Sequence, residues 1–356
     1  MTNRVKLIWS ILLLSFSLNG FSQSAADVPG WVMYYSDEFD SLKTDSWKPA
    51  NNSDGFASNR NRQSFNRKLV YTSRPENIRW ESGNLIIRVN AEKYSCPANE
   101  RDMYGCSAEG QSTLPYEFTS GSVESKNPFR FGLIEARVKI PDIKGLNAAF
   151  WLLNGSDPFQ EIDIFEMIPG ARTDGLNQMH DKFVMTSNWH LLGGVDLSSE
   201  GQTSLSFVDD YTQYHNYAIE WTTSKLIFYV DGKVVRNTIH GGMLNRPLWP
   251  IFSIGFSDYL APLPENFPGE MKVDWIRAYK LKYDCGTTID SCQYSFTTAN
   301  SPILKRISIG GSGCVNTVPQ GADIYLRASE GIEISGDFTV PSGAELFLDS
   351  NPCLGE

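Results

Sequence analysis

The stretch Glu161-Ile162-Asp163-Ile164-Phe165-Glu166-Met167 decides the fold, because it combines three carboxylates with large apolar and β-branched residues. That mixture predicts a β-strand with one face packed in a core and the other face carrying acids. Residues two apart in a regular strand share a face, so Glu161 and Asp163 project together while Glu166 points the other way. One extra residue, a β-bulge, would return Glu166 to their face, and bulges are common beside active sites.

Three carboxylates on one face of a strand are typical of an acid–base catalytic site. Ionising all three at close range is costly, and a glycosidase needs one anionic nucleophile and one protonated acid. The outer Cα atoms would lie roughly 13 Å apart at ~3.3 Å per residue over four steps. Inward-leaning Glu side chains could then reach the carboxyl spacing of a retaining enzyme, about 5–5.5 Å. A solvated acidic face is the alternative, but the apolar residues between the acids count against it.

The motif resembles the E-x-D-x-x-E signature of the family 16 glycoside hydrolases. Other segments resemble that family in the same order, from about Trp31 to Lys282: residues 36–39, 74–78, 83–87, 118–121, 131–137, 214–221, 229–232 and 271–277. The resemblance implies a jelly-roll sandwich of two curved antiparallel sheets with a cleft on the concave face. It also implies that Glu161 is the nucleophile, Glu166 the general acid/base and Asp163 a helper, in endo-acting retaining hydrolysis of a β-linked polysaccharide.

A sugar ring presents a C–H face to aromatic side chains and a rim of hydroxyls to polar ones. Asn188, Trp189 and His190 form a polar and aromatic cluster after the acidic strand, and the family has a similar His/Trp strand there. We expect these three residues and Trp151 to contact the substrate. Packing in the core is the alternative for any single Trp.

Two departures from the laminarinase-like branch of the family bear on the substrate. Its Trp-Pro pair is replaced by Asn147-Ala148, and residues 156–160 lack its W-P-x-x-G pattern. Laminarin-type β-1,3-glucan is the first expectation for the substrate, and a red-algal galactan (agar, porphyran or carrageenan) is the alternative. Arg60 and Arg62 would then bind sulfate groups, since guanidinium pairs well with oxyanions. A solvated loop is the other interpretation of that segment.

No cofactor is expected for catalysis. Family members often hold a structural calcium ion, and its ligands match Glu38, the backbone carbonyl of Gly83 and Asp274 here. Calcium prefers such oxygen ligands. Without the resemblance, both acids would be read as surface charges.

The N-terminus has the pattern of a secretory signal peptide over residues 1–22, with Arg4 and Lys6 before a short apolar run. The run is too short for a membrane span. We therefore expect a secreted protein (periplasmic, extracellular or at the cell surface), a monomer with a polysaccharide as its partner. The net charge of −10 argues against nucleic acid as a partner.

The six cysteines form local pairs in the sequence, namely Cys96/Cys106, Cys285/Cys292 and Cys314/Cys353, which are plausible disulfides in an exported protein. Other pairings are compatible with the sequence.

Short alternating or apolar runs separated by turn residues predict an all-β fold, and Asp231-Gly232 predicts a β-hairpin with a two-residue turn. We expect a catalytic sandwich over residues 23–282 and a small disulfide-stapled β module over 283–356, where short alternating runs recur about every seven residues. That module could bind carbohydrate, serve export or attachment, or act as a spacer.

Two further functions are open. A glycan-binding sandwich without catalysis is one, although it has no need of clustered acids. A surface protein whose C-terminal module is the active part is the other.

Overall fold

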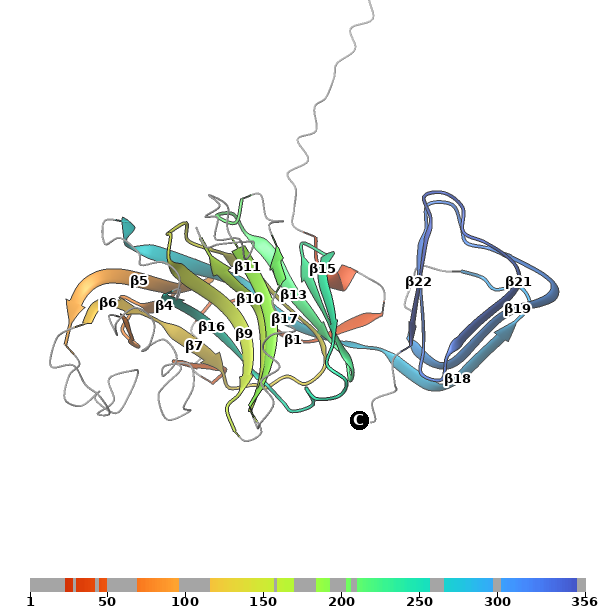
Figure 1. The fold of residues 1–356 in the computed structure, drawn as a ribbon, viewed down its shortest axis with the longest axis horizontal. Helices are drawn as coiled ribbons and strands as arrows, with labels where there is room; N and C mark the ends of the chain where they lie inside the picture. Colours follow the sequence, from red (N-terminus) through yellow and green to blue (C-terminus); the bar gives the residue numbers. More distant parts are fainter. Residues whose placement is uncertain are drawn as a thin grey trace, which may run out of the picture.

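The fold consists almost entirely of β-strands (Figure 1). The computed structural model describes residues 23–27, 30–41, 45–49, 69–95, 116–156, 159–169, 184–192, 203–205, 210–256, 266–296 and 302–350. Arg60, Arg62, Cys96, Cys106 and Cys353 lie outside these ranges, as do residues 1–22.

Two sheets form the larger part of the molecule. The ten-stranded sheet has the order β15-β14-β13-β8-β17-β5-β6-β3, with β1 beside β17 and β4 beside β5, and the seven-stranded sheet has the order β12-β11-β10-β9-β16-β7-β2. The strands of the first are β1 (Trp31–Asp37), β3 (Leu69–Tyr71), β4 (Ile78–Glu81), β5 (Asn84–Tyr94), β6 (Tyr116–Ser120), β8 (Gly132–Lys139), β13 (His215–Trp221), β14 (Lys225–Val230), β15 (Lys233–Ile239) and β17 (Gly269–Leu281). Those of the second are β2 (Trp47–Pro49), β7 (Ser122–Ser125), β9 (Leu146–Asn154), β10 (Phe159–Ile168), β11 (Val184–Leu192), β12 (Thr203–Leu205) and β16 (Trp249–Phe256).

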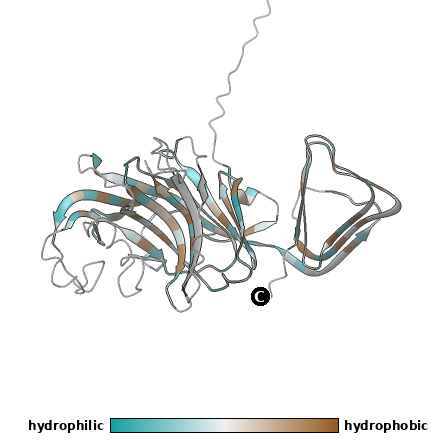
Figure 2. Cartoon of the chain, in the orientation of Figure 1, coloured by the Kyte–Doolittle hydropathy of each residue, from teal (hydrophilic) through white to brown (hydrophobic). Residues whose placement is uncertain are grey.

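The core lies between these two sheets, and alternating apolar and polar residues along the strands build it (Figure 2). Phe165 of β10 meets Tyr217 of β13 across it, with ring centroids 4.4 Å apart. The predicted jelly-roll sandwich is confirmed. All pairings in these two sheets are antiparallel except the parallel pair β3–β6.

The predicted hairpin at Asp231-Gly232 is confirmed between β14 and β15. Both turn residues have positive φ, 49° and 72°, which the two-residue turn needs and which Gly adopts without strain.

A short 3-10 helix, η1 (Ala25–Asp27), lies on the other face of the ten-stranded sheet. It is tied to Glu135 of β8, a fully buried residue. The Glu135 carboxylate accepts a hydrogen bond of 2.5 Å from the Ser24 hydroxyl and one of 2.8 Å from the Ala25 N–H. Burial raises the pKa of Glu135, and these two donors partly offset that rise.

The C-terminal residues form a separate sheet with its own apolar core, in which every pairing is parallel. Its strands are β18 (Tyr283–Ser291), β19 (Ile303–Thr317), β20 (Asp323–Ala328), β21 (Ile332–Thr339) and β22 (Glu345–Ser350). The register places Asp323 beside Glu345 and Val315 beside Asp337, each 22 residues further along the chain. The strands are therefore coils stacked with a spacing of about 22 residues, and the triangular outline in Figure 1 explains the shorter sequence period of about seven.

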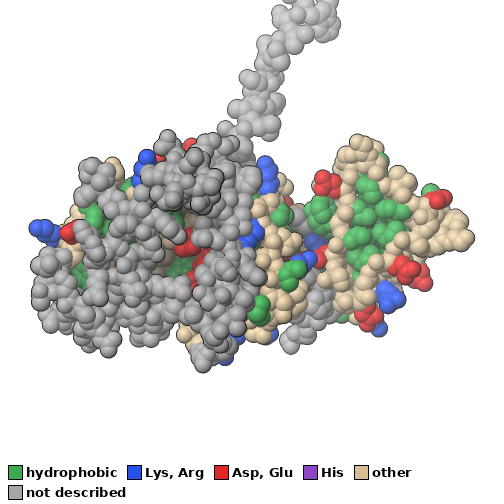
Figure 3. Space-filling view, viewed as in Figure 1, with side chains coloured by type: hydrophobic (Ala, Val, Ile, Leu, Met, Phe, Trp, Pro, Cys, Tyr) green, Lys and Arg blue, Asp and Glu red, His purple; other side chains and the backbone are tan. Residues whose placement is uncertain are grey.

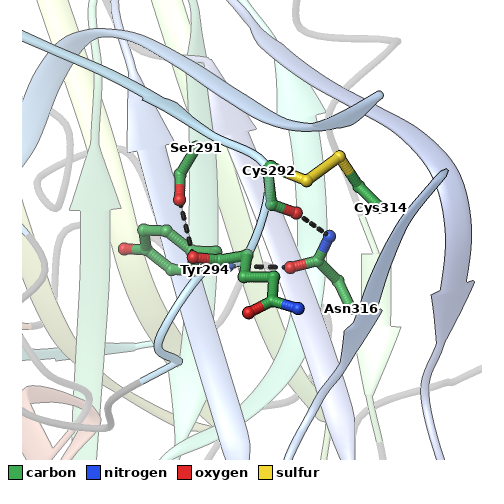
Figure 4. Close-up of a disulfide and its surroundings, with 6 residues drawn as sticks. Ser291, Cys292, Tyr294, Cys314 and Asn316 are labelled. Atoms are coloured by element: carbon green, nitrogen blue, oxygen red, sulfur yellow. Dashed lines mark hydrogen bonds between the residues drawn. A yellow bond between two sulfur atoms is a disulfide. The ribbon is translucent and has the colours of Figure 1, made fainter. Parts of the chain in front are cut away.

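The disulfide within this stack differs from our prediction. Cys292 is bonded to Cys314, so the pairings Cys285/Cys292 and Cys314/Cys353 are wrong; Cys285 is also disulfide-bonded. The physical reason is the coil spacing, because residues 22 apart lie above one another. Figure 4 shows the bond beside Asn316, whose amide accepts from the Tyr294 N–H (2.8 Å) and donates to the Cys292 carbonyl (2.9 Å).

The last coil leaves apolar positions exposed. Leu326 of β20 is buried, whereas its counterpart Leu348 on β22 is 53% exposed, and Val340 is 42% exposed against 0% for Val318. Figure 3 shows apolar side chains gathered between β21 and β22. The stack also contacts the sandwich, since Lys225 Nζ lies 3.0 Å from the Asp349 carboxylate.

Candidate functional site

The strand β10 contains the predicted bulge. Between Asp163 and Glu166, β10 advances three residues while β11 advances two, from Asn188 to Thr186. On the other side, Asp163 pairs with Trp151 but Phe165 already pairs with Phe150. One extra residue is therefore inserted at Ile164.

Burial shows what the bulge does to the side chains. Ile162, Ile164, Phe165 and Met167 all belong to the core between the sheets. Two consecutive core residues, Ile164 and Phe165, reverse the alternation, so Glu166 has the same facing as Glu161 and Asp163. All three acids lie on the face of the seven-stranded sheet that is turned away from the core, which we call the outer face.

Neighbouring strands extend the outer face in rows, because directly paired residues of antiparallel strands share a face. Leu153 lies beside Glu161, Trp151 beside Asp163, and Ala149 beside Glu166. Trp151 is thus next to the acids and packs with Ala149, Leu153 and Ile251, and its contact with the substrate stays a prediction. Its indole Nε1 donates a hydrogen bond of 3.2 Å to the Ser253 hydroxyl.

The register of β11 places the backbone of the predicted Asn-Trp-His cluster directly beside the acidic strand. Asn188 is paired with Asp163 and His190 with Glu161, whereas Trp189 is paired with Ile162, a core residue. The backbone positions of Asn188 and His190 therefore match the acids, and that of Trp189 matches the core side. Substrate contacts of all three stay predictions.

Burial makes the acid row electrostatically sensitive. Glu161 is 5% and Asp163 3% exposed, while Glu166 is half-buried. Arg236 of β15, itself buried, interacts electrostatically with Asp163: burial lowers the pKa of Arg236 to about 10, and the Asp163 charge opposes this. Arg236 therefore stays cationic at neutral pH and places a positive charge near the acid row.

Two contacts of β10 and β9 could not be derived from the motif. Asn147 donates a hydrogen bond of 2.9 Å from Nδ2 to Glu166 Oε1. Gln160 braces the loop after β15: its Nε2 donates to the Met243 carbonyl (2.9 Å), and its Oε1 accepts from the N–H groups of Asn245 and Arg246 (3.0 Å each). The signal for Asn147 was a polar residue in an apolar strand, but its partner required the register of β9 with β10.

The two acids predicted to bind calcium are engaged otherwise. Both Glu38 carboxylate oxygens accept hydrogen bonds from Arg277, at 3.0 and 2.8 Å, and Asp274 lies 2.5 Å from Arg137 Nη1. In the described ranges, no group of three or more His, Cys, Asp and Glu is placed to hold a metal ion. These contacts do not fit a cation site at Glu38, Gly83 and Asp274, because a cation would have to displace two guanidinium groups.

These observations define a β-sandwich with three carboxylates in a row on the outer face of one sheet. The chain belongs to glycosyl hydrolases family 16, because the model of that family matches residues 71–277. The resemblance read from the sequence is thereby confirmed.

Two curated relatives indicate the range of the family. An endo-1,3-1,4-beta-glycanase of Rhizobium meliloti is 27% identical over 177 residues, which are 48% of this chain and 36% of that protein. A kappa-carrageenase of Pseudoalteromonas carrageenovora is 24% identical over 266 residues, 66% of this chain and 65% of that protein. The chain thus spans less than two thirds of the length of either relative.

A solved structure supports the fold. The laminarinase catalytic domain of Thermotoga maritima superposes with a TM-score of 0.54 at 24% identity, covering 70% of this chain and 98% of that one.

Proposed function

We propose that this chain is a retaining endo-β-glycanase that hydrolyses a β-linked polysaccharide on the outer face of the seven-stranded sheet. The observation that supports it most is the bulge at Ile164, which gives Glu161, Asp163 and Glu166 one facing. An ordinary binding face has no need of three acids in a largely buried row, because their mutual repulsion costs stability.

The proposed reaction has two steps. Protonated Glu166 gives its proton to the glycosidic oxygen while the Glu161 carboxylate attacks the anomeric carbon, so the leaving chain departs and a glycosyl ester forms on Glu161. Glu166, now ionised, takes a proton from water, and the resulting hydroxide attacks the same carbon and releases Glu161. The anomeric configuration is inverted twice and therefore retained.

Asp163 is the proposed helper. It lies two residues from Glu161 on the same face and is nearly fully buried. It interacts electrostatically with the Arg236 cation. A carboxyl group at this place would orient Glu161, as the helper role requires.

Laminarin-type β-1,3-glucan is the proposed substrate. The similarity to a 1,3-1,4-β-glycanase and to a laminarinase supports it. Lys48 of β2 lies on the outer face and forms an ion pair with Glu124 of β7, with 3.2 Å between Lys48 Nζ and Glu124 Oε1. A neutral sugar suits such a neutralised pair better than a sulfated one does.

A red-algal galactan is the second candidate, and the similarity to a kappa-carrageenase favours it. Asn147 in place of the Trp of the laminarinase-like branch is the sequence difference in its favour. Sulfate binding by Arg60 and Arg62 belongs to this candidate and concerns residues outside the described ranges.

The experiment is a screen of the protein on laminarin, mixed-linkage glucan, agarose, porphyran and carrageenans, with reducing ends counted and products sized. Glu161→Gln and Glu166→Gln should abolish release while leaving the fold intact. Near-normal activity in either variant would refute the roles. Binding without cleavage over the whole panel would favour the non-catalytic sandwich.

Export as a secreted monomer completes the proposal. No helix in the described ranges is long and apolar enough to cross a membrane. N-terminal sequencing of the exported protein, expected to begin at Gln23, tests the signal peptide, and light scattering tests the monomer. Hydrolysis that survives deletion of residues 283–356 would exclude the C-terminal module as the active part.

A further inference from the structure

Asn147 is bound to one of the two proposed catalytic carboxylates. It lies on β9 with the facing of Ala149 and Trp151, since Ala148 and Phe150 between them belong to the core. Its amide Nδ2 is 2.9 Å from Glu166 Oε1, within normal hydrogen-bond distance. The amide therefore reaches the acid group along the outer face from the neighbouring strand.

The other end of the same amide is in an unusual state. Asn147 Oδ1 is buried and accepts no hydrogen bond from the described residues. Buried polar atoms without partners are rare, because each forfeits its hydration with no replacement. A group that could satisfy this oxygen is a hydroxyl donor arriving beside Glu166, which is what a bound sugar provides.

The hydrogen bond matters for the two protonation states that Glu166 must adopt. An amide N–H donates better to a carboxylate than to a carboxylic acid, so it favours the ionised form. The ionised form is required when water is activated, and the protonated form when the leaving chain departs. A donor at this place also fixes the direction in which the carboxyl group points.

We propose that Asn147 is a positioning residue for Glu166, which it holds through Nδ2, and that it receives a sugar hydroxyl on Oδ1. This inference rests on the proposed function. It gives one amide an influence on the alkaline limit of activity and a contact to the sugar unit at the cleaved bond.

Two substitutions separate this role from simple packing. Asn147→Ala removes both ends of the amide, and Asn147→Asp keeps the shape but replaces the donor with a second carboxylate. Asn154→Ala is the matched control, because Asn154 is on the same strand and its Nδ2 donates to the Pro247 carbonyl (3.0 Å) instead of a carboxylate.

The first readout is kcat and KM on the best polysaccharide of the screen from pH 4 to 10. The alkaline limb should move up by about one pH unit in Asn147→Ala, as expected for loss of one hydrogen bond to a charged group. It should move further in Asn147→Asp, where like charges adjoin. We also expect KM to rise in both Asn147 variants. Asn154→Ala should keep the alkaline limb of the wild-type pH profile, even if this variant has a lower Tm.

The second readout does not need activity. Carbon-13 NMR follows the Glu166 side-chain carboxyl through its titration, with Glu166→Gln used for assignment, and the midpoint should rise in the order wild type, Asn147→Ala, Asn147→Asp. Equal midpoints and equal alkaline limbs in all three proteins would overturn the inference. A moving midpoint in a protein without hydrolytic activity would support the contact while refuting the proposed function.

Discussion

Two changes in β10 separate the effect of the bulge from the effect of the direction in which the Glu166 side chain points. Deleting Ile164 leaves Glu161, Asp163 and Glu166 at two-residue steps, so all three acids keep one facing. Phe165 pairs with Phe150 and Glu166 with Ala149, so these pairs follow the Asp163–Trp151 pair on β9 without a gap. The deletion therefore leaves the register of β10 with β9 unchanged. Inserting an alanine between Phe165 and Glu166 instead gives Glu166 the facing of the core.

The structure sets the magnitudes. Ile164 is 2% exposed, and its loss from the core should cost about 2–5 kcal/mol, or a Tm lower by roughly 5–15 °C. The insertion turns Met167, 1% exposed, outward at a cost of about 1.5–3 kcal/mol, and burying the carboxylate adds several kcal/mol. Loss of a general acid should lower kcat by about 100-fold or more.

The assay is reducing-end release by both variants, with Glu166→Gln as reference and near-UV circular dichroism as the test of folding. The deletion variant should exceed the Glu166→Gln rate at least tenfold, and the insertion variant should match it. A folded insertion variant as active as the deletion variant would refute the reasoning about facing.

Three further predictions concern stability. Gln160→Leu removes three hydrogen bonds between the Gln160 side chain and backbone groups, and it should lower the free energy of unfolding by about 2–4 kcal/mol in urea titrations; an unchanged midpoint would contradict the bracing role. Replacing Cys292 and Cys314 by serine opens a closed segment of 22 residues and should cost about 3 kcal/mol, read from the melting of the C-terminal stack; equal melting would show that the coils hold without it. Burial disfavours the charged His215 ring, but hydrogen bonds to Asp231 and to a backbone carbonyl outweigh it and raise the pKa of His215. That contribution is complete below about pH 6.5 and is lost as pH rises through the raised value, so His215→Gln should cost more at pH 6 than at pH 9; the opposite order would exclude the ion pair.

The acidic strand illustrates what sequence alone can predict. Its alternation, interrupted by the adjacent apolar pair Ile164 and Phe165, is a local signal, and it specified both the strand and its bulge. The hairpin at Asp231-Gly232 is local in the same sense, because two residues determine the turn. These features required no knowledge of which strands are neighbours.

Contacts between strands could not be predicted from such local patterns. The pairing of Asn188 with Asp163 and of His190 with Glu161 needed the register of β11 with β10, which the motif does not give. The Asn147 contact needed the register of β9 with β10, which no short motif encodes.

The disulfide error has a similar origin, although a signal was present. Thr317-Val-Pro-Gln-Gly-Ala and Thr339-Val-Pro-Ser-Gly-Ala repeat at an offset of 22 residues, the separation of Cys292 and Cys314. Pairing by nearness in sequence ignored this repeat, which predicts stacked coils.

The most direct test of the central claim, that one bulged strand presents a nucleophile and an acid/base to the same sugar, is azide rescue of two alanine variants on an aryl β-glycoside of the preferred substrate. Azide should replace the missing nucleophile in Glu161→Ala and give an α-glycosyl azide by a single inversion. In Glu166→Ala it should attack the glycosyl ester and give the β-glycosyl azide. The same anomer from both variants, or no rescue of either folded protein, would contradict the assignment.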